Sequence, residues 1–570
     1  MALLQAVLVG LVALIIAPGA LFYFDVTPKL VVLLAGAAAL CLAAIRSRLS
    51  ANRTFSLLLL LSFASLILST ALSSDPALSL YGSTWRRFGL VAQFAVLLCA
   101  WMIAATADRL PLLRGIAVAS GLAALYGIAQ YFGWDPFLPA AGYHIGEGIW
   151  TIVRPPSTFG YVSYFATWML VAGFLSLSLD TRLGWLAAGL CWTAMLLTGT
   201  RAALLGLAVG LLLWGYRRGF RLPRRALGVA ALVVAAGAAF YVSPAGWNLR
   251  SRTRWFVEDP WGGTRPLLWR DSLRMAIHRP LAGFGPETFT AAFPHYESIE
   301  LARAYPDFSH ESPHNIFLDA LVGEGIPGLL CLIALCVVGL RARQPWFAAA
   351  LAAAIAAQQF TAFTIPTALI FYVVLAIAVK PERAPVTVPR FVLAPLALPL
   401  LYLAIRIAAA DHSLALADRA LRAGDPRAAD AHYADYLRRK LPGASADLWY
   451  ARALLSVKAP DPARQIQAFQ LAAAAGDRAT RTADDPFNAW YNLAIIRAAQ
   501  NDAAGAENSL RQSINANPNW FKPHWTLAQL LLLEHRLPEA LAEAEFAADR
   551  NGGRNPEVAA TLMQIRASHK

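Results

Sequence analysis

Residues 312–340 read SPHNIFLDALVGEGIPGLLCLIALCVVGL. Their apolar part, Ile316 to Leu340, is long enough to cross the roughly 30 Å hydrocarbon core of a bilayer as a helix. Before it lies a polar stretch, from about Ser243 to Asn315, with eight Arg, eight Asp or Glu and four His. A membrane protein can place polar backbone only outside the hydrocarbon or around a wet cavity. The polar stretch therefore predicts a loop outside the membrane, and we expect the chemistry there.

The apolar residues are concentrated in the first part of the chain. Hydrophobic residues make up 58% of the 570 residues and the mean hydropathy is +0.49, but the apolar runs stop near residue 410. After that point, charged residues recur every few positions. We therefore expect an all-α protein with two parts, a polytopic membrane domain at 1–410 and a soluble domain at 411–570.

The basic residues predict the orientation in the membrane. The formal net charge of +14 does not indicate a nucleic-acid partner, because most of the excess falls in short loops. Alternate loops hold 15 basic residues, including five Arg between positions 217 and 225. The opposite short loops hold only Lys29, Arg86, Arg87, Arg154 and Arg201. The positive-inside rule therefore puts the polar loop 243–315 on the outer face.

The number of spans decides where the C-terminal domain lies. Thirteen put that domain on the outer face with the loop, whereas twelve put it in the cytoplasm. The region 346–379 fits one broken helix or two short spans. The first run lacks a basic n-region and is interpreted as a span rather than a cleaved signal peptide. The expected spans are 4–24, 29–45, 55–73, 88–106, 110–132, 160–180, 184–199, 202–216, 226–243, 316–340, 346–364, 366–379 and 391–409.

The cysteines exclude one class of structure. All five lie in apolar runs, so neither a disulfide framework nor a cysteine-rich metal site is expected. The chain also has no P-loop lysine, no Gly-x-Ser-x-Gly elbow and no His-Glu-x-x-His motif. The cysteines are Cys41, Cys99, Cys191, Cys331 and Cys336.

A repeat of about 34 residues runs through the C-terminal part. Small residues at its alanine positions let two antiparallel helices pack closely. With the aromatic pair Trp490-Tyr491 and with Pro518, the pattern resembles the tetratricopeptide repeat. One longer step predicts an insertion near Gly476–Asp485. Such a solenoid binds a partner protein, or acts only as a stabilising cap. Two alanine series carry the period: Ala417, Ala451, Ala494 and Ala528, and Ala429, Ala463, Ala506 and Ala540.

Four segments stand in a fixed order around the spans: Arg154–Gly160, Thr198–Arg201, Gly262–Pro286, and His314–Gly328. Together they resemble the O-antigen ligase and Wzy-type polymerase superfamily, which includes bacterial protein O-oligosaccharyltransferases. The resemblance covers roughly residues 55–380, although Thr158-Phe159-Gly160 lacks the Asn residues that usually follow. The matching residues are Arg265, Trp269, Pro280, Gly283, Gly285, His314, Asn315, Gly325 and Gly328.

The resemblance implies a GT-C-like glycosyltransferase of the bacterial inner membrane that needs neither a metal nor another cofactor. Its donor would be a glycan linked to undecaprenyl diphosphate. Its acceptor would be a hydroxyl of a lipid A core, a growing polysaccharide or a protein, on the periplasmic face. Membrane lipids and a protein at the repeats are the other expected partners. The alternative is a transporter, flippase or scaffold for the same glycan, but a transporter should show ionisable residues along its spans.

A lipid diphosphate at the membrane surface needs fixed positive charge. The planar guanidinium of Arg can bind two phosphate oxygens at once. With the resemblance, this makes Arg201 and Arg265 the first candidates for donor binding, followed by Arg154 and Arg270.

The charges of the loop are unevenly distributed. Seven Arg face three acids between Arg250 and Arg279, whereas one Arg faces five acids from Leu281 to Asn315. We expect the basic half to face the leaving group and the acidic half to border the acceptor. Arg86 and Arg87 are assigned instead to ordinary lipid head groups.

His314 is the candidate general base. A neutral imidazole can take the proton of an acceptor hydroxyl as that hydroxyl attacks the anomeric carbon. His310 is the competing candidate, and Asn315 is expected to cap or orient the next helix. Asp319 and Glu324 lie in or near an apolar span, where ionisable groups are costly. They are expected to orient His314, to bind the acceptor, or to line a wet cavity.

Overall fold

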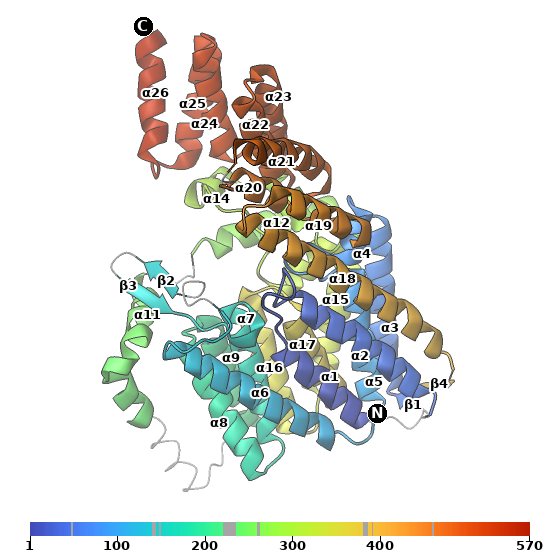
Figure 1. Ribbon diagram of the computed structural model, residues 1–570. Helices are drawn as coiled ribbons and strands as arrows, with labels where there is room; N and C mark the ends of the chain where they lie inside the picture. Colours follow the sequence, from blue (N-terminus) through green and yellow to red (C-terminus); the bar gives the residue numbers. More distant parts are fainter. Residues whose placement is uncertain are drawn as a thin grey trace.

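The computed structural model describes residues 1–46, 49–138, 144–147, 150–219, 235–258, 263–379, 386–389, 391–458 and 461–569, and it is almost entirely helical (Figure 1). A bundle of apolar helices forms one part, and stacked helical hairpins form the other. The helices of the bundle are α1 (Ala2–Leu14), α2 (Thr27–Ala44), α3 (Arg53–Ala71), α4 (Pro76–Tyr81), α5 (Leu90–Ala104), α6 (Leu110–Tyr131), α7 (Val162–Leu177), α8 (Arg182–Leu197), α9 (Arg201–Arg217), α15 (Ile316–Leu340), α16 (Pro345–Ala357), α17 (Ile365–Ala378) and α18 (Ala397–Arg422).

By length and composition, the bundle is a multi-pass membrane domain. Five segments are long and apolar enough to span a bilayer: α2, α3, α6, α15, and Ala394–Arg422, which contains α18. The helices α1, α5, α7, α8 and α17 are apolar but shorter. The strands are few and short: β1 (Leu49–Ala51) pairs antiparallel with β4 (Val386–Val388), and β2 (His144–Glu147) pairs antiparallel with β3 (Trp150–Val153).

Most of the expected spans coincide with a helix. The region 346–379 forms two helices, α16 and α17, because a 3₁₀ turn at Gln358–Phe360 and an extended Thr361 interrupt the helix. α1 is shorter than expected, since the chain becomes extended at Ile15.

One expected span, 226–243, falls largely outside the described residues, which resume as a helix at 235–242. Part of the charge pattern behind the topology prediction lies outside them too. The residues concerned are Arg48, Arg221, Arg224, Arg225, Lys380, Arg383 and Arg390.

The polar loop is itself a folded element. It contains α11 (Trp247–Glu258), α12 (Arg265–His278), α13 (Phe289–Ala292) and α14 (Ile299–Ala304). Helices α12 to α14 share a small apolar core, built on Leu268, Met275, Phe293 and Leu301, and Val322 of α15 joins it. This core attaches the loop to the N-terminal part of α15, so the loop is held against the bundle.

The C-terminal part consists of antiparallel hairpins, each packed on the next. α18 and α19 (Pro426–Arg439) form the first. α20 (Asp447–Leu455) and α21 (Pro462–Thr482), α22 (Pro486–Ala499) and α23 (Ala503–Ala516), and α24 (Phe521–Leu533) and α25 (Leu537–Asn551) form the others, followed by α26 (Pro556–His569). The expected boundary between 410 and 411 lies inside α18, so a continuous helix joins the two parts.

The repeat positions are mostly buried between these helices, with one exception. Seven of the eight predicted alanines are buried, but Ala463 is exposed. Ala472, 34 residues before Ala506, is fully buried in its place. The prediction of an insertion near Gly476–Asp485 was therefore wrong. The extra residues precede Ala472, where they extend the linker and the first turns of α21.

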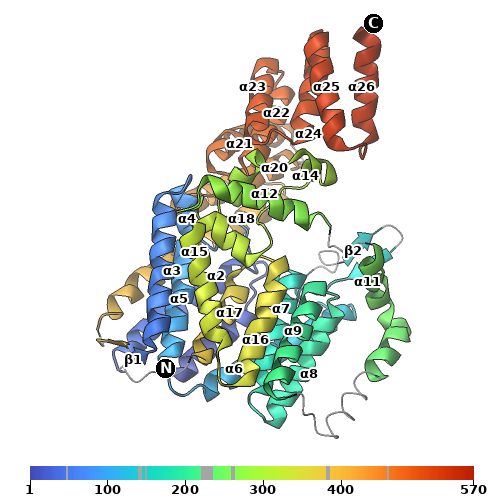
Figure 2. The same cartoon turned by 180° about the vertical axis from the view of Figure 1, so that it is seen from behind.

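The hairpins lie at the same end of the molecule as α12 and α14, opposite the N-terminus and β1 (Figures 1 and 2). Four helical segments, α15 to α18, separate the loop from the hairpins. After these four segments, the chain therefore returns to the end of the bundle at which the loop lies.

Close packing of α9 on α16 holds one side of the bundle. Helices without large side chains at their contact can approach closely, and this is a common way to pack helices in a membrane. A Cβ on Gly206 of α9 would lie 2.6 Å from the backbone oxygen of Ala353 in α16, whereas a Cβ on Gly189 of α8 would meet nothing within 4 Å.

We therefore expect Gly206→Ala to destabilise the bundle by about 1–3 kcal/mol, because the added methyl forces α9 and α16 apart. Gly189→Ala is the matched control and should leave stability unchanged or slightly increased. Thermal unfolding of both variants in detergent measures the difference. Equal stability of the two variants would contradict the packing described.

Candidate functional site

His314 sits in a tight turn that immediately precedes α15. Its φ is 51°, in the left-handed region that costs energy for a residue with a side chain. Ser312 supports the turn, since its Oγ accepts a hydrogen bond from the His314 backbone N–H at 3.1 Å and lies 3.3 Å from Nδ1. The indole of Trp269 donates to the Pro313 carbonyl at 3.0 Å. Backbone strain of this kind persists only where the surroundings hold it, and it gathers at functional positions.

Asn315 fixes the other side of the same turn. Its Oδ1 caps α15 by accepting from the N–H groups of Phe317 (3.0 Å) and Leu318 (3.2 Å). Its Nδ2 donates to Gln359, between α16 and α17, at 3.0 Å. The prediction that Asn315 caps the next helix is confirmed.

Two of the glycine-rich segments meet as one unit. α15 breaks at Gly325, where φ is 72°, and backbone carbonyls and one N–H near this break bind the turn at 280–286. Phe284 donates to the Val322 carbonyl (2.9 Å), Gly285 to the Gly323 carbonyl (3.0 Å), and Ile326 to the Pro280 carbonyl (2.7 Å). The turn is thereby joined to the helix that follows His314.

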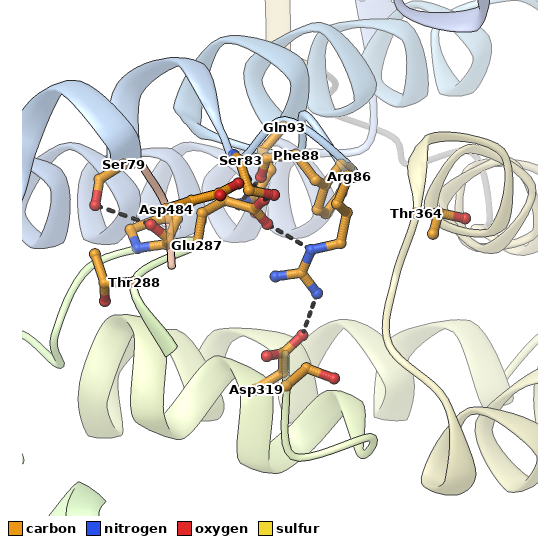
Figure 3. A network of polar contacts seen from close by, with 12 residues as sticks. Ser79, Ser83, Arg86, Phe88, Gln93, Glu287, Thr288, Asp319, Thr364 and Asp484 are labelled. Carbon is orange, nitrogen blue, oxygen red and sulfur yellow. Dashed lines mark hydrogen bonds and ion pairs between the residues drawn. The ribbon is translucent and has the colours of Figure 1, made fainter. Parts of the chain in front are cut away.

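Arg86 is the centre of a buried ionic network (Figure 3). Its Nε lies 2.5 Å from Glu287 and its Nη1 lies 3.1 Å from Asp319. The Ser83 backbone N–H (3.1 Å) and hydroxyl (2.6 Å) donate to the other oxygen of Glu287. Burial lowers the pKa of Arg86, but the two carboxylates more than offset this and raise it. We call these four residues the Arg86 network.

The assignment of Arg86 and Arg87 to lipid head groups was wrong. The Arg86 side chain is only 6% exposed. Arg87 also turns inward, to Asp411 of α18 at 3.1 Å and over the ring of Tyr23. The carboxylates that bind both residues are far away in sequence, so no local pattern distinguishes these arginines from lipid-facing ones.

His314 opens onto a cavity of about 1080 Å³, including the part open to solvent. Charged side chains line it, namely Asp25, Lys29, Arg86 and Glu311. Aromatic side chains line it as well, namely Trp85, Phe159, Tyr161, Tyr164 and Phe308. The Thr158-Phe159-Gly160 element forms part of this wall, and Thr158 is anchored by donating to the Ala13 carbonyl at 2.6 Å. We call this space the His314 cavity.

Burial lowers the pKa of His314 to about 4, and the positive charges of Arg265 and Arg86 act in the same direction. At neutral pH the imidazole is therefore uncharged and keeps a lone pair, which is the form that accepts a proton. An uncharged, oriented imidazole at an open cavity is suited to general-base chemistry.

The match to known proteins covers this part of the molecule. Residues 186–333 match the family model of the O-antigen ligases. The matched region runs from α8 into α15 and includes the loop and His314. No curated protein matches the chain. The family match supports the ligase and polymerase superfamily, and with it a membrane glycosyltransferase type of activity.

Within the O-antigen ligase region, the predicted arginines take different places. Arg265 begins α12, and its guanidinium lies 5.8 Å from the Phe360 ring, near enough to affect the pKa of His314. Arg201 begins α9 and is half-buried. Arg154 is also half-buried but lies outside this region, after β3. Neither Arg154 nor Arg201 is among the described residues that line the His314 cavity.

Arg270 is held away from His314 by contacts within the loop. It binds Asp271 (3.0 Å), Ser298 (2.7 Å) and Glu300 (3.3 Å). Arg274 pairs with Asp271 as well. The basic half of the loop therefore does not act as one surface, because part of its charge is neutralised by its own carboxylate.

His310 does not share the position of His314. It is buried among Phe293, Tyr305 and Phe308, with Nε2 3.8 Å from a Glu297 carboxylate oxygen. Burial lowers the pKa of His310 to about 4. It is not among the described residues lining the His314 cavity, so the two histidines occupy separate environments.

Asp319 and Glu324 line a second space of about 900 Å³, including the part open to solvent, between α3, α5, α15 and α17. Arg86 borders both this space and the His314 cavity. Asp319 binds Arg86 in the first turn of α15, directly after the turn that carries His314. Both carboxylates therefore line this space, and the expected roles in orienting His314 or binding the acceptor stay predictions.

The sequence did not predict that Lys29 lies at the His314 cavity. Its Nζ donates to the carbonyls of Val12 (3.1 Å) and Ile15 (2.8 Å) at the end of α1, and it lines the His314 cavity. A lone lysine at the start of an apolar run was an available signal, because ionisable residues in spans are costly and often functional.

Replacing Arg86 by methionine should destabilise the protein by about 3–5 kcal/mol, because it leaves Glu287 buried without its cation. Arg274→Met, in the same polar loop, is the control. The Arg274 side chain is 58% exposed, and Asp271 keeps its bond to Arg270 when Arg274 is lost, so this pair should be worth less than about 1 kcal/mol. Chemical denaturation in detergent measures both. An Arg86→Met variant as stable as Arg274→Met would refute the central role of the Arg86 network.

Proposed function

We propose that the protein transfers a glycan from an undecaprenyl-diphosphate-linked donor to an acceptor hydroxyl, on the periplasmic face of the bacterial inner membrane. The observation that carries this proposal is His314: an uncharged imidazole, fixed in a strained turn, at the mouth of a cavity in the O-antigen ligase region. No other described histidine combines these properties.

The proposed reaction is a displacement at the anomeric carbon. With Nδ1–H directed at Ser312, His314 Nε2 accepts the proton of the acceptor hydroxyl. The acceptor oxygen forms the new glycosidic bond as the bond from the anomeric carbon to the diphosphate oxygen breaks. That bond's electron pair leaves on the lipid diphosphate, a leaving group that needs charge stabilisation more than a proton.

Arg265 is the proposed cation for the departing diphosphate, because it begins α12 close to His314. Arg201 and Arg154 are proposed to bind donor phosphates further from the base. Arg86 is excluded from this role, since Glu287 and Asp319 already neutralise it.

The walls of the His314 cavity support a saccharide as the ligand. Sugar rings present apolar C–H faces that pack on aromatic rings, such as Trp85 and Tyr161, and hydroxyls that donate to carboxylates, such as Asp25 and Glu311. The acceptor is proposed to be a hydroxyl of a lipid A core, a growing polysaccharide or a protein.

The rate of glycan transfer should fall only at an unusually acidic pH. A general base works in its neutral form, and the pKa of His314 is lowered to about 4. We therefore expect turnover to stay level from about pH 8 to about pH 5 and to fall only near pH 4. Initial rates across this range, with recovery checked at pH 7 to exclude unfolding, measure the limit. A midpoint near the usual histidine value of about 6.5 would contradict the lowered pKa.

The purified protein, given an undecaprenyl-diphosphate oligosaccharide and candidate acceptors, should release undecaprenyl diphosphate. His314→Ala should lower turnover about 10²- to 10⁴-fold, because the general base is lost. Arg265→Ala should also lower turnover strongly, because the leaving charge loses its cation. His310→Ala and Arg274→Ala are the controls and should remain active. No release with any acceptor would refute the proposed function, and full activity of both site variants would refute the site.

A further inference from the structure

Among the described residues, contacts from the later hairpins reach the surroundings of the site in two regions. The first contact reaches the segment of the Arg86 network. Asp484, in the turn before α22, accepts from both the backbone N–H and the hydroxyl of Thr84, each at 2.9 Å. In the sequence, Thr84 lies between Ser83 and Arg86, two members of the network. The C-terminal domain therefore binds the backbone from which Arg86 extends.

The second contact holds the segment that leads into the His314 turn. Asn519 donates to the Glu297 carbonyl at 2.9 Å. Lys522 of α24 lies 2.9 Å from Asp307. Arg303 of α14 pairs with Asp549 of α25. All three partners belong to residues 297–307, and the His314 turn begins only a few residues later.

These contacts come from one edge of the hairpin stack. Asp484 and Asn519 stand in the turns before α22 and α24, and Asp549 lies in the last turn of α25. Because the edge binds two separate segments, it restrains their relative movement. This restraint matters for His314. Its turn is fixed on the C-terminal side by Asn315 and α15, and on the N-terminal side it continues from residues 297–311.

We propose that the C-terminal helical domain is a positioning part of the transfer site. Its edge clamps residues 297–307 and Thr84, so that His314 and Arg86 keep their relative places while the domain is docked. Lys522, Asp549 and Asp484 are positioning residues, since they act through the segments they hold. The consequence for turnover rests on the proposed function, whereas the clamp itself does not.

The contacts of the clamp should affect the position of His314 more than they affect the stability of the protein. Partly exposed ion pairs, such as Lys522–Asp307, contribute little to stability, because solvent screens the two charges. Misplacing a catalytic group by about 1 Å, in contrast, can reduce a rate about a hundredfold. Losing one clamp contact should therefore change turnover much more than the unfolding temperature.

A charge swap at Lys522–Asp307 tests the clamp in the full-length protein. In the described part of the chain, neither residue has another ion pair, so the swap is clean. Lys522→Asp and Asp307→Lys each place two like charges together, and the double variant restores an opposite pair. Hydrogen–deuterium exchange of residues 305–315 should rise severalfold in each single variant and return to the wild-type level in the double variant. The unfolding temperature should stay the same throughout.

Turnover of the undecaprenyl-diphosphate oligosaccharide is the second readout. Each single variant should lose about ten- to a hundredfold in kcat with little change in KM, and the double variant should recover. The matched control is Arg566→Glu, which breaks an exposed pair with Glu545 between α25 and α26 and should change neither readout.

The two proposals fail in different ways. Unchanged exchange in the single variants, or no recovery in the double variant, would overturn the clamp. A wild-type protein without turnover would count against the proposed function, and the exchange measurements would still decide the clamp. Restored exchange without restored kcat would overturn the positioning role.

Discussion

The site depends on one buried interaction, the pairing of Arg86 with Glu287 and Asp319. Each of the three residues comes from a different element: the connection between α4 and α5, the turn after α12, and the first turn of α15. A buried charge is costly unless it is paired, and removing one partner leaves the others uncompensated. This requirement ties the three elements into one arrangement. The His314 turn immediately precedes α15, and its position follows from that arrangement.

The remaining contacts fix the same unit from other directions. Trp269 holds the Pro313 carbonyl, Asn315 caps α15, and the turn at 280–286 bonds to the break in α15 at Gly325. The break is useful because it frees carbonyls that an intact helix would use internally. The polar loop thus becomes a continuation of the bundle, and this gives His314 a defined place.

Local patterns predicted most of the architecture. Apolar runs marked the helices of the bundle, since length and hydropathy are properties of a segment alone. The Asn315 cap was predictable for the same reason, because a cap needs only the next few residues. The alanine period located the hairpins but misplaced one alanine, because Ala463 fits the spacing of the first two repeats while Ala472 is buried. Spacing cannot show on which side of a packed residue an insertion falls.

By itself, the sequence determined the helical class, the outer loop as the expected place for chemistry, and His314 with Arg265 as candidates through their resemblance to a family. Only the tertiary structure decided where each charged side chain points and which partner it binds. It turned Arg86 inward, bound Arg270 to Asp271, buried His310 among aromatic rings, and brought Lys29 to the cavity wall. The reason is physical: a charged side chain is placed by the partners that compensate it. Those partners lie up to hundreds of residues away in sequence, as Asp411 does from Arg87.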